Sequence, residues 1–206
     1  MTVPAQSLAG PPAKPQTERA QVWLREGLSI LAESGVESLT IEELCRRLNR
    51  TKGAFYHHFP HRQGYVDALL LYWERKMTQD LIDLSSVEDD PLRRLHRLGA
   101  AIAERATPSL EVAIRAWAMR DPAIHPYQER VDALRLAYLR DIFTALLGDA
   151  AEGRTRASIT YAVLVGGYHI MPPITGRHLT SLFAHLERLY QPDNHAKNQE
   201  SRGAGQ

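Results

Sequence analysis

The chain has 206 residues, of which 44% are hydrophobic and 24% are charged, and its formal net charge is +1 at pH 7. This is an ordinary globular composition, with enough residues for one or two domains that each bury a core. The near-zero net charge excludes nothing about partners, so only the distribution of charge is informative. Cys45 is the only cysteine, which excludes an intramolecular disulfide.

The two ends of the sequence differ from the rest in composition. Met1 to Gln16 is rich in proline and alanine and lacks a charged segment leading into an apolar one, so no signal peptide is expected. We expect residues 1–16 to be a disordered arm and 191–206 a disordered tail. The densest apolar run, Ala68 to Trp73, is far shorter than the roughly 20 residues of a membrane helix. A cytoplasmic protein without a membrane partner is the simplest interpretation.

Almost every segment between these ends has helical spacing. A first helix is predicted from Thr17 to Ser34, ended by Gly35. The next begins at Thr40, whose hydroxyl can accept the amide of Glu43 while the Glu43 carboxylate reaches back to the Thr40 amide, as in a capping box.

The remaining helices are predicted from periodicity and from their start signals. A long helix covers Gln63 to Leu84, and the last two cover Glu152 to Ile170 and Arg177 to Tyr190. Three others begin where an N-cap residue precedes a proline, at Asp90-Pro91, Thr107-Pro108 and Asp121-Pro122. No segment shows sustained strand alternation, so we predict an all-α fold of about nine helices.

The segment from Ile41 to Phe59 has the layout of a helix-turn-helix. The first helix carries an apolar stripe, a turn follows at Leu48 to Arg50, and a short helix runs from about Thr51 to His58. Phe55 and Phe59 would face the core of the domain. The outward positions are then Thr51, Lys52, Ala54, His57 and His58, with Tyr56 at the edge. A short helix that presents small and polar side chains can enter the major groove.

Positive charge and histidine both concentrate in this segment. Between Cys45 and Val66 there is no acidic residue, and five residues are basic: Arg46, Arg47, Arg50, Lys52 and Arg62. We expect a surface that faces phosphate, and a solvated surface without a partner is the alternative. The three histidines, His57, His58 and His61, could suggest metal ligands. Adjacent helical residues point about 100° apart, however, and no carboxylate lies close by in the sequence, so no metal site is expected.

The stretch TKGAFYHHFP at Thr51 to Pro60 closely resembles the recognition-helix signature of the tetracycline-repressor-like (TetR) family. Leu39 to Leu44 and the opening helix match that family in type and spacing, so the resemblance covers about residues 17 to 71. Two positions depart from the pattern. Asn49 replaces the usual turn glycine, which is tolerable because asparagine visits the left-handed region readily. Arg50 replaces a usually apolar residue, and it either points outward to a phosphate or lies with its stem buried.

The resemblance implies a role for each matching position. Thr40 caps the second helix and touches a phosphate, Tyr56 binds a phosphate through its hydroxyl, and Arg62 stands where the family usually has a lysine. The start of the recognition helix makes phosphate and base contacts. The DNA-binding residues expected from the resemblance are Thr40, Arg50, Thr51, Lys52, Gly53, Ala54, Tyr56, His57, His58 and Arg62.

The rest of the chain resembles the family only in length and helical character. The resemblance implies a DNA-binding domain at 17–62 and an effector-binding and dimerisation domain at 63–190. A pocket could involve Trp117, Tyr138, Tyr168, His169 and Met171, although each is equally well explained as core or interface. The last two helices could pair with those of a second copy in a four-helix bundle, with Gly166 and Gly167 permitting close approach. The candidate interface is Tyr161, Leu164, Tyr168, Leu179, Leu182, Phe183 and Leu186, and intrachain core is the alternative.

These observations predict a homodimeric repressor that binds a near-palindromic DNA operator and is released by an unknown small-molecule effector. An all-helical enzyme is a weaker hypothesis, because the sequence contains no nucleophile elbow, phosphate-binding glycine loop or metal motif, and no cofactor is expected. A non-specific architectural DNA-binding protein is a third, which the near-zero net charge disfavours.

Overall fold

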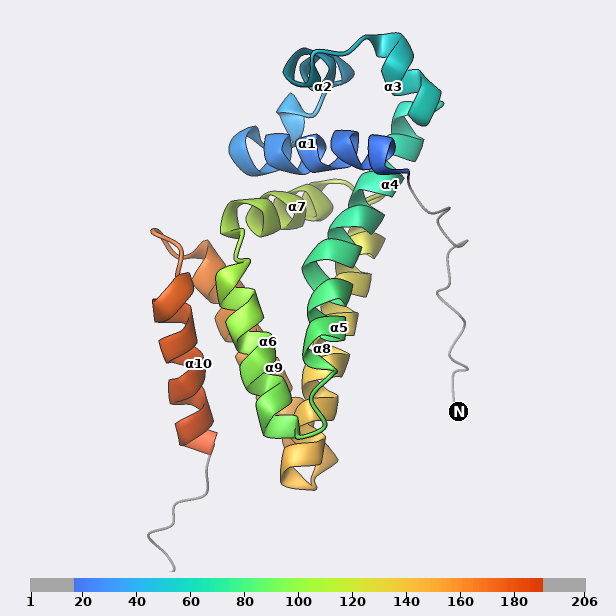
Figure 1. Cartoon of the computed structure of the whole chain (residues 1–206). Coiled ribbons are helices and arrows are strands. Elements are labelled where there is room, and N and C mark those ends of the chain that lie inside the picture. The colour runs from blue at the N-terminus through green and yellow to red at the C-terminus, as the bar shows by residue number, and fades with distance from the viewer. Residues whose placement is uncertain (1–16, 191–206) are drawn as a thin grey trace, which may run out of the picture. The chain divides into compact units, whose positions relative to one another are not determined.

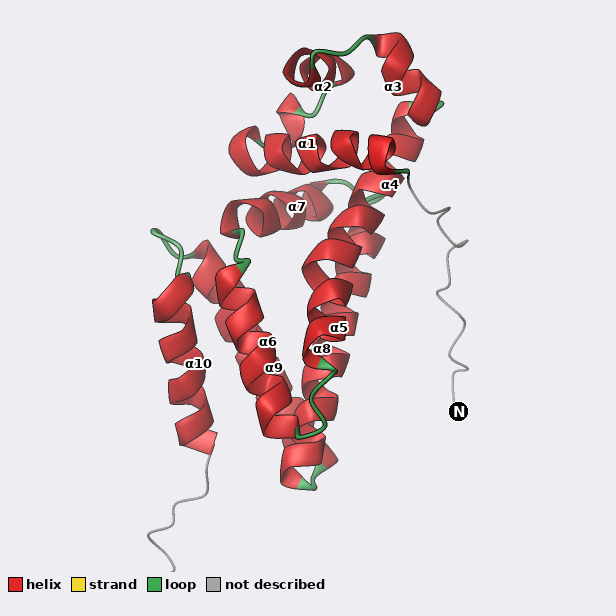
Figure 2. Cartoon of the chain, in the orientation of Figure 1, coloured by secondary structure: helices red, strands yellow, loops and turns green. Residues whose placement is uncertain are grey.

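The computed structural model describes residues 17–190, and within that range the secondary structure is helical, without a strand (Figure 2). The predicted all-α fold is therefore confirmed. The predicted arm at 1–16 and tail at 191–206 lie outside the described residues. Within the described range, no helix is both long enough and apolar enough to cross a membrane.

The helices follow the predicted order (Figure 1). They are α1 (Glu18–Ser34), the 3-10 turn η1 (Val36–Ser38), α2 (Ile41–Leu48), α3 (Lys52–His58), α4 (Arg62–Glu74), the π-helical segment η2 (Arg75–Gln79), α5 (Asp80–Ser85), α6 (Pro91–Glu104), α7 (Pro108–Arg120), α8 (His125–Leu147), α9 (Ala150–His169) and α10 (Gly176–Tyr190). Because α4, η2 and α5 follow without a break, they form the one long helix predicted for this region. Counted in this way, the described residues form nine helices.

The described chain forms two compact units. The first contains the described residues up to Asp80 together with Ser109–Leu134, and the second contains Leu81–Pro108 together with the described residues from Arg135 onward. Helix α7 and the start of α8 therefore share a core with the helix-turn-helix. This division into compact units does not test the predicted boundary between the DNA-binding and effector-binding domains, at residues 62 and 63, which stays a prediction.

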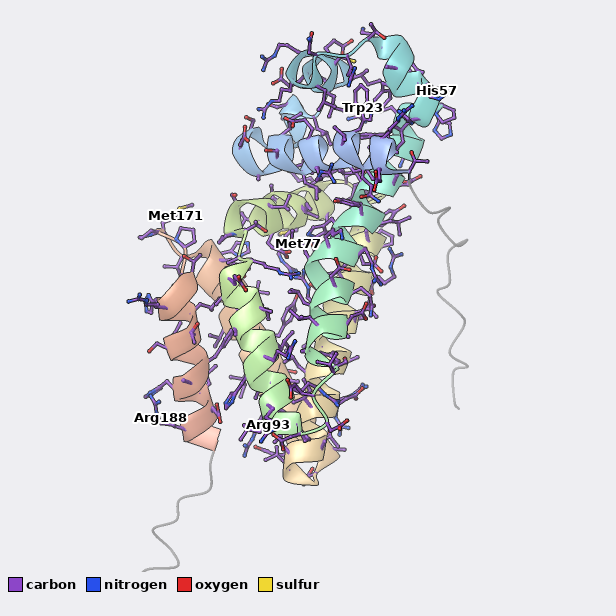
Figure 3. The ribbon with its side chains drawn as sticks, in the orientation of Figure 1. Trp23, His57, Met77, Arg93, Met171 and Arg188 are labelled. Atoms are coloured by element: carbon purple, nitrogen blue, oxygen red, sulfur yellow. The ribbon has the colours of Figure 1, made fainter. Side chains whose placement is uncertain are left out.

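An aromatic cluster holds the helix-turn-helix together. The ring of Phe55 on α3 lies 5.5 Å from that of Trp23, 5.4 Å from that of Phe59 and 5.2 Å from that of Tyr65, centroid to centroid. All four side chains are buried, and Trp23 points from α1 toward the helix-turn-helix (Figure 3). Such pairs add about 0.5–1.5 kcal/mol beyond the burial of their area, so the orientation of α3 is fixed mainly by Phe55.

Helices α1 and α4 approach closely at Gly27. The Tyr65 hydroxyl on α4 donates a hydrogen bond to the Trp23 carbonyl oxygen at 3.0 Å. A Cβ atom added at Gly27 would lie 2.0 Å from that hydroxyl oxygen. Only a residue without a side chain leaves room for this buried contact.

The start signals predicted for the later helices have mixed outcomes. Helix α6 begins at Pro91, and the Asp90 carboxylate accepts the Arg93 amide at 2.8 Å, as predicted. Helix α7 also begins where it was predicted, at Pro108. The start predicted at Asp121-Pro122 was wrong, because residues 122–124 form a turn and α8 begins at His125. Pro126 provides a second start signal there, since proline fits the first turn of a helix, where its missing N–H is not needed.

The second unit packs α6, the later part of α8, α9 and α10. A Cβ added at Gly153 on α9 would lie 2.9 Å from the Thr144 backbone nitrogen on α8, so this glycine permits a close approach of two helices. Gly166 and Gly167 do not have that role within the chain. Gly166 has no neighbouring atom within 4 Å of its would-be Cβ, and Gly167 makes an ordinary 3.5 Å contact with Ile174.

Candidate nucleic-acid interface

The turn between α2 and α3 is formed by Asn49. Its φ of 50° and ψ of 52° are left-handed, as the sequence led us to expect for the residue in place of the usual glycine. The Arg50 amide donates to the Cys45 carbonyl at 2.9 Å, which closes the end of α2. Arg50 itself is exposed. Its side chain therefore fits the outward orientation better than the orientation with a buried stem.

Both helices of the motif are capped by threonine hydroxyls. Thr40 Oγ1 accepts the Glu43 amide at 3.1 Å, and Thr51 Oγ1 accepts the Ala54 amide at 3.2 Å. The reciprocal half of the predicted capping box is absent, because the Thr40 amide instead donates to the Ser38 carbonyl oxygen at 2.8 Å. The Glu43 carboxylate turns to two guanidinium groups, whose charge makes them stronger partners than a neutral amide. The hydroxyl hydrogens of both threonines remain available as donors to a phosphate.

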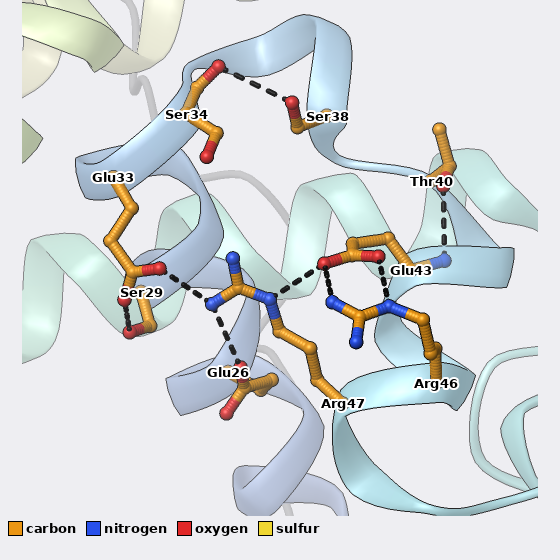
Figure 4. Close-up of polar contacts among 9 residues, drawn as sticks. All are labelled: Glu26, Ser29, Glu33, Ser34, Ser38, Thr40, Glu43, Arg46 and Arg47. Atoms are coloured by element: carbon orange, nitrogen blue, oxygen red, sulfur yellow. Dashed lines mark hydrogen bonds and ion pairs between the residues drawn. The ribbon is translucent and has the colours of Figure 1, made fainter.

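A network of ion pairs joins α2 to α1 (Figure 4). Arg47 donates to Glu33 at 2.7 Å and to Glu43 at 2.8 Å, and its longer 3.4 Å contact reaches Glu26. Arg46 makes two bonds to the same Glu43 carboxylate, at 2.6 and 2.7 Å. Hydrogen bonds from the two arginines lower the pKa of Glu43 to about 2. The network therefore stays charged over the physiological pH range.

These contacts change the balance of charge inferred from the sequence. Three of the five basic residues are paired, because Arg46 and Arg47 bind Glu43 and Lys52 binds Glu42. Their partners precede Cys45 in the sequence, outside the stretch that contains no acidic residue. Arg50 and Arg62 are exposed, and neither forms an ion pair with a described carboxylate. Of the five basic residues, Arg50 and Arg62 therefore have a positive charge available to a phosphate.

The outward face of α3 carries most of the predicted contact residues. Thr51, Lys52, Gly53 and His57 are exposed, and Tyr56 exposes 47% of its surface, which is unusual for so large a ring. Figure 3 shows His57 projecting away from the domain core. Ala54 and His58 are half-buried, with Ala54 packed on the core. Burial lowers the pKa of His58 below its usual value, so its ring is neutral at pH 7.

Gly53 has no structural reason to be glycine. Its φ is not in the left-handed region, it is exposed, and a Cβ there would meet only Thr51 Oγ1 at 3.7 Å, an ordinary contact. Glycine inside a helix costs about 0.5–1 kcal/mol relative to alanine. A glycine that the fold does not require leaves the backbone of α3 open to close approach by another molecule.

His61 has a role that its sequence position did not predict. Its Nδ1 accepts the Gly64 amide at 2.9 Å and so caps α4, where serine, threonine or aspartate is more usual. His57 and His58 stack edge to face, with ring centroids 5.2 Å apart. Among the described residues no group of three or more histidine, cysteine or acidic side chains is placed to hold a metal ion. The Cys45 thiol is buried, and burial raises its pKa.

The residues predicted for a ligand pocket do not come together at one place. Trp117 is buried in the core of the first unit and also borders a hollow with Thr40 and Arg62. Tyr138 and Tyr168 belong to the second unit, where the Tyr138 hydroxyl bonds to that of Ser85 at 2.8 Å. His169 is exposed, and so is Met171, 87% of whose surface is open in the loop before α10 (Figure 3).

The residues predicted for a dimer interface divide into two groups by burial. Tyr161, Leu164, Tyr168 and Leu179 are buried within their own chain. Leu182, Phe183 and Leu186 on α10 are half-buried. The exposed face of α9 carries different residues, including Ile159, Ala162 and Gly166.

The comparisons with known proteins agree with this geometry. Residues 24–69 match the family described as bacterial regulatory proteins, tetR family. The chain is 31% identical over 146 residues to the tetracycline repressor protein class C of Escherichia coli, an alignment that covers 70% of this chain and 59% of that protein. It is 33% identical over 88 residues to the transcriptional regulator AcuR of Cereibacter sphaeroides, covering 41% of this chain and 38% of that protein. The chain thus spans less than two thirds of the length of these curated relatives.

Solved structures share the fold over nearly their whole length. Reduced NemR from E. coli superposes with a TM-score of 0.67 at 17% identity, covering 83% of this chain and 96% of that one. A TetR transcription regulator from Haloarcula marismortui superposes with a TM-score of 0.68 at 15% identity, covering 83% and 95%. At these identities the likeness is one of fold.

Proposed function

We propose that the chain, whose helix-turn-helix domain matches the TetR family of transcriptional regulators and whose fold resembles theirs, is a homodimeric, ligand-responsive repressor. It binds a near-palindromic operator and leaves the DNA when a small molecule binds. The observation that carries the proposal is the outward face of α3, where exposed Lys52, Tyr56 and His57 surround an unconstrained Gly53.

Each part of this surface suits one component of DNA. A tyrosine hydroxyl and the exposed guanidinium groups of Arg50 and Arg62 are phosphate-binding groups, and contacts to phosphate set the position of the protein on the duplex. Side chains at the start of α3 reach base edges in the major groove. A backbone without a Cβ at Gly53 lets the helix approach the groove wall closely.

The proposed dimer uses the free face of α9 together with α10. Ile159, Ala162 and Gly166 are exposed and recur at three- and four-residue intervals, so they share one side of the helix. The space above Gly166 allows the close approach of a second helix. Of the half-buried candidates on α10, Leu182 would extend this surface, whereas Phe183 and Leu186 face the space between α6 and α10; the four buried candidates support the surface from within the chain.

A dimer explains both the operator symmetry and the response to an effector. Two recognition helices would read half-sites about 10 base pairs apart, so the operator should be a near-palindrome. An effector that favours a different spacing of these helices weakens DNA binding, and by linkage DNA weakens effector binding by the same factor.

Selection from a random pool of duplex DNA at moderate salt tests the proposal. We expect enrichment of one near-palindromic sequence. Binding with steep salt dependence and no sequence preference would support an architectural DNA-binding protein instead. The absence of any enriched duplex would contradict the proposal.

Two variants test the roles assigned on α3. Tyr56→Phe removes a hydroxyl and Lys52→Ala removes a charge, and both side chains are exposed, so neither change should affect folding. We expect each to weaken binding to the selected operator, while sedimentation shows an unchanged dimer. Unchanged affinity in both variants would refute these roles.

A further inference from the structure

The second unit contains a partly open cavity of about 200 Å³ between α6, α8, α9 and α10. Its walls come from all four helices and are mainly apolar. The larger apolar side chains among them include Leu95, Leu98, Leu139, Phe143, Phe183 and Leu186. None of the five residues predicted from the sequence for a ligand pocket lines this cavity.

One buried hydroxyl in the cavity wall has no partner. Thr160 on α9 is 9% exposed, and its Oγ1 forms no hydrogen bond within the structure. Most buried polar atoms in proteins are hydrogen-bonded, because leaving a buried hydroxyl unsatisfied destabilises the folded protein. A bound molecule with one polar group would satisfy this hydroxyl in a mainly apolar cavity.

A histidine and a carboxylate at the cavity bridge two of its helices. Nε2 of His96 on α6 lies 2.8 Å from a Glu187 carboxylate oxygen on α10, and both residues belong to the lining. His96 is exposed and Glu187 is half-buried, so the pair stands between the cavity and solvent. A ligand carboxylate would meet Glu187 as a like charge, which disfavours anionic ligands.

We propose that this cavity binds a small uncharged molecule, made of one hydrocarbon ring and one hydroxyl group that hydrogen-bonds to Thr160. The size follows from volume, because an apolar cavity of about 150 Å³ is known to hold benzene in another protein. A cavity of about 200 Å³ therefore holds such a ring with a short substituent. The single polar group follows from Thr160, since no other unsatisfied buried side chain is present in the lining.

Occupation of this cavity can affect the geometry of a dimer. Helix α10 forms one wall of the cavity through Thr180, Phe183 and Ala184, and it also belongs to the proposed dimer surface. A ligand that changes the separation of α6 and α10 would therefore shift the helices that face the second copy. This regulatory part rests on the proposed function, whereas ligand binding by the cavity does not.

Calorimetric titration of the purified full chain with three probes tests the binding. The probes are benzyl alcohol, toluene and benzoate, which share a ring and differ in the polar group. We expect benzyl alcohol to bind about fivefold more tightly than toluene, as one additional hydrogen bond allows, and benzoate not to bind. Absence of benzyl alcohol binding, or equal affinity for benzyl alcohol and toluene, would overturn the proposal.

Two variants locate the site. Thr160→Val keeps the shape of the side chain and removes the hydroxyl, so toluene should bind as before while the preference for benzyl alcohol falls to less than about twofold. Gly99→Leu extends a side chain from α6 into the cavity and should abolish binding of both. Its first atom would sit 3.5 Å from Phe183, an ordinary contact, and leucine is a better helix former than glycine, so the variant should fold. Thr155→Val, on the exposed side of α9, is the matched control and should bind all probes as wild type.

The two proposals fail separately in these experiments. If Gly99→Leu folds and still binds benzyl alcohol as wild type does, the cavity is not the site. If benzyl alcohol binds in the wild type but leaves operator affinity unchanged, the regulatory part is wrong and the binding site stands. If the protein selects no operator, the proposed function fails, while the calorimetric result still decides the cavity.

Discussion

Alanine at two glycines of the helix-turn-helix domain should have opposite effects on stability. Gly27 and Gly53 both lie inside helices, and neither has a positive φ. The replacement adds the same methyl group at both sites, with a gain in helix propensity of about 0.8–1.0 kcal/mol in the interior of α1 and a smaller gain in the first turn of α3. Opposite signs in the two variants would therefore report the surroundings of the methyl group.

At Gly27 the surroundings oppose the methyl group. It would lie 2.0 Å from the Tyr65 hydroxyl oxygen and 3.1 Å from Leu69, in a fully buried contact between α1 and α4. Overpacking of this kind costs about 1–3 kcal/mol, and displacing the hydroxyl loses its bond to the Trp23 carbonyl, worth about 1 kcal/mol. After the gain in propensity, Gly27→Ala should destabilise the protein by about 1–3 kcal/mol.

At Gly53 nothing opposes the methyl group, whose only contact is at 3.7 Å. Gly53→Ala should therefore stabilise the protein by up to about 1 kcal/mol. If the backbone of α3 lies against DNA there, the same methyl group should weaken operator binding. Gain of stability and loss of affinity in one variant would separate a functional glycine from a structural one.

Urea unfolding followed by circular dichroism measures both effects, with the midpoint compared at unchanged m-value. Tyr65→Phe in the Gly27→Ala background removes the clashing oxygen and should recover part of the loss. A Gly27→Ala variant as stable as wild type would refute the packing argument. A destabilised Gly53→Ala variant would show that the fold does require this glycine.

Two further predictions concern charge near α3. Glu42→Gln removes the carboxylate that pairs with Lys52, so fluorescence anisotropy should show operator binding strengthened about two- to fivefold at low salt. The gain should be smaller at high salt, because salt screens exposed charges. Equal affinity of the variant and wild type at low salt would contradict this prediction. Burial lowers the pKa of His58, so the unfolded chain takes up this proton more readily, and the free energy of unfolding should fall as the pH drops below the ordinary value of 6.5. His58→Gln should reduce that fall between about pH 7 and pH 5, and an unchanged pH profile would remove His58 as a cause.

The helices could be predicted from the sequence because their causes are local. Apolar residues at three- and four-residue intervals identify a helix, and a cap such as Asp90 lies within one turn of the amide that it accepts. Two local start signals can also lie close together, as at the start of α8. Asp121-Pro122 and His125-Pro126 offer two start signals four residues apart, and the sequence does not say which will be used.

The charge of the candidate site could not be predicted, because its partners are distant in sequence. The basic stretch after Cys45 lacks acidic residues, yet Arg47 reaches Glu26 and Glu33 on α1 in the folded chain. The cavity could not be predicted from the sequence for the same reason. It depends on how four helices pack and on one hydroxyl, Thr160, that finds no partner.

The salt dependence of operator binding tests the central claim most directly. Affinity for the selected operator would be measured at a series of salt concentrations for wild type, Arg50→Ala, Arg62→Ala and Arg93→Ala. Arg93 is an exposed arginine on α6 and controls for the change in net charge. We predict that Arg50→Ala and Arg62→Ala each reduce the slope of log affinity against log salt by about two, one phosphate contact for each subunit of a dimer, while Arg93→Ala leaves it unchanged. Equal slopes for all four proteins would contradict DNA binding through this surface.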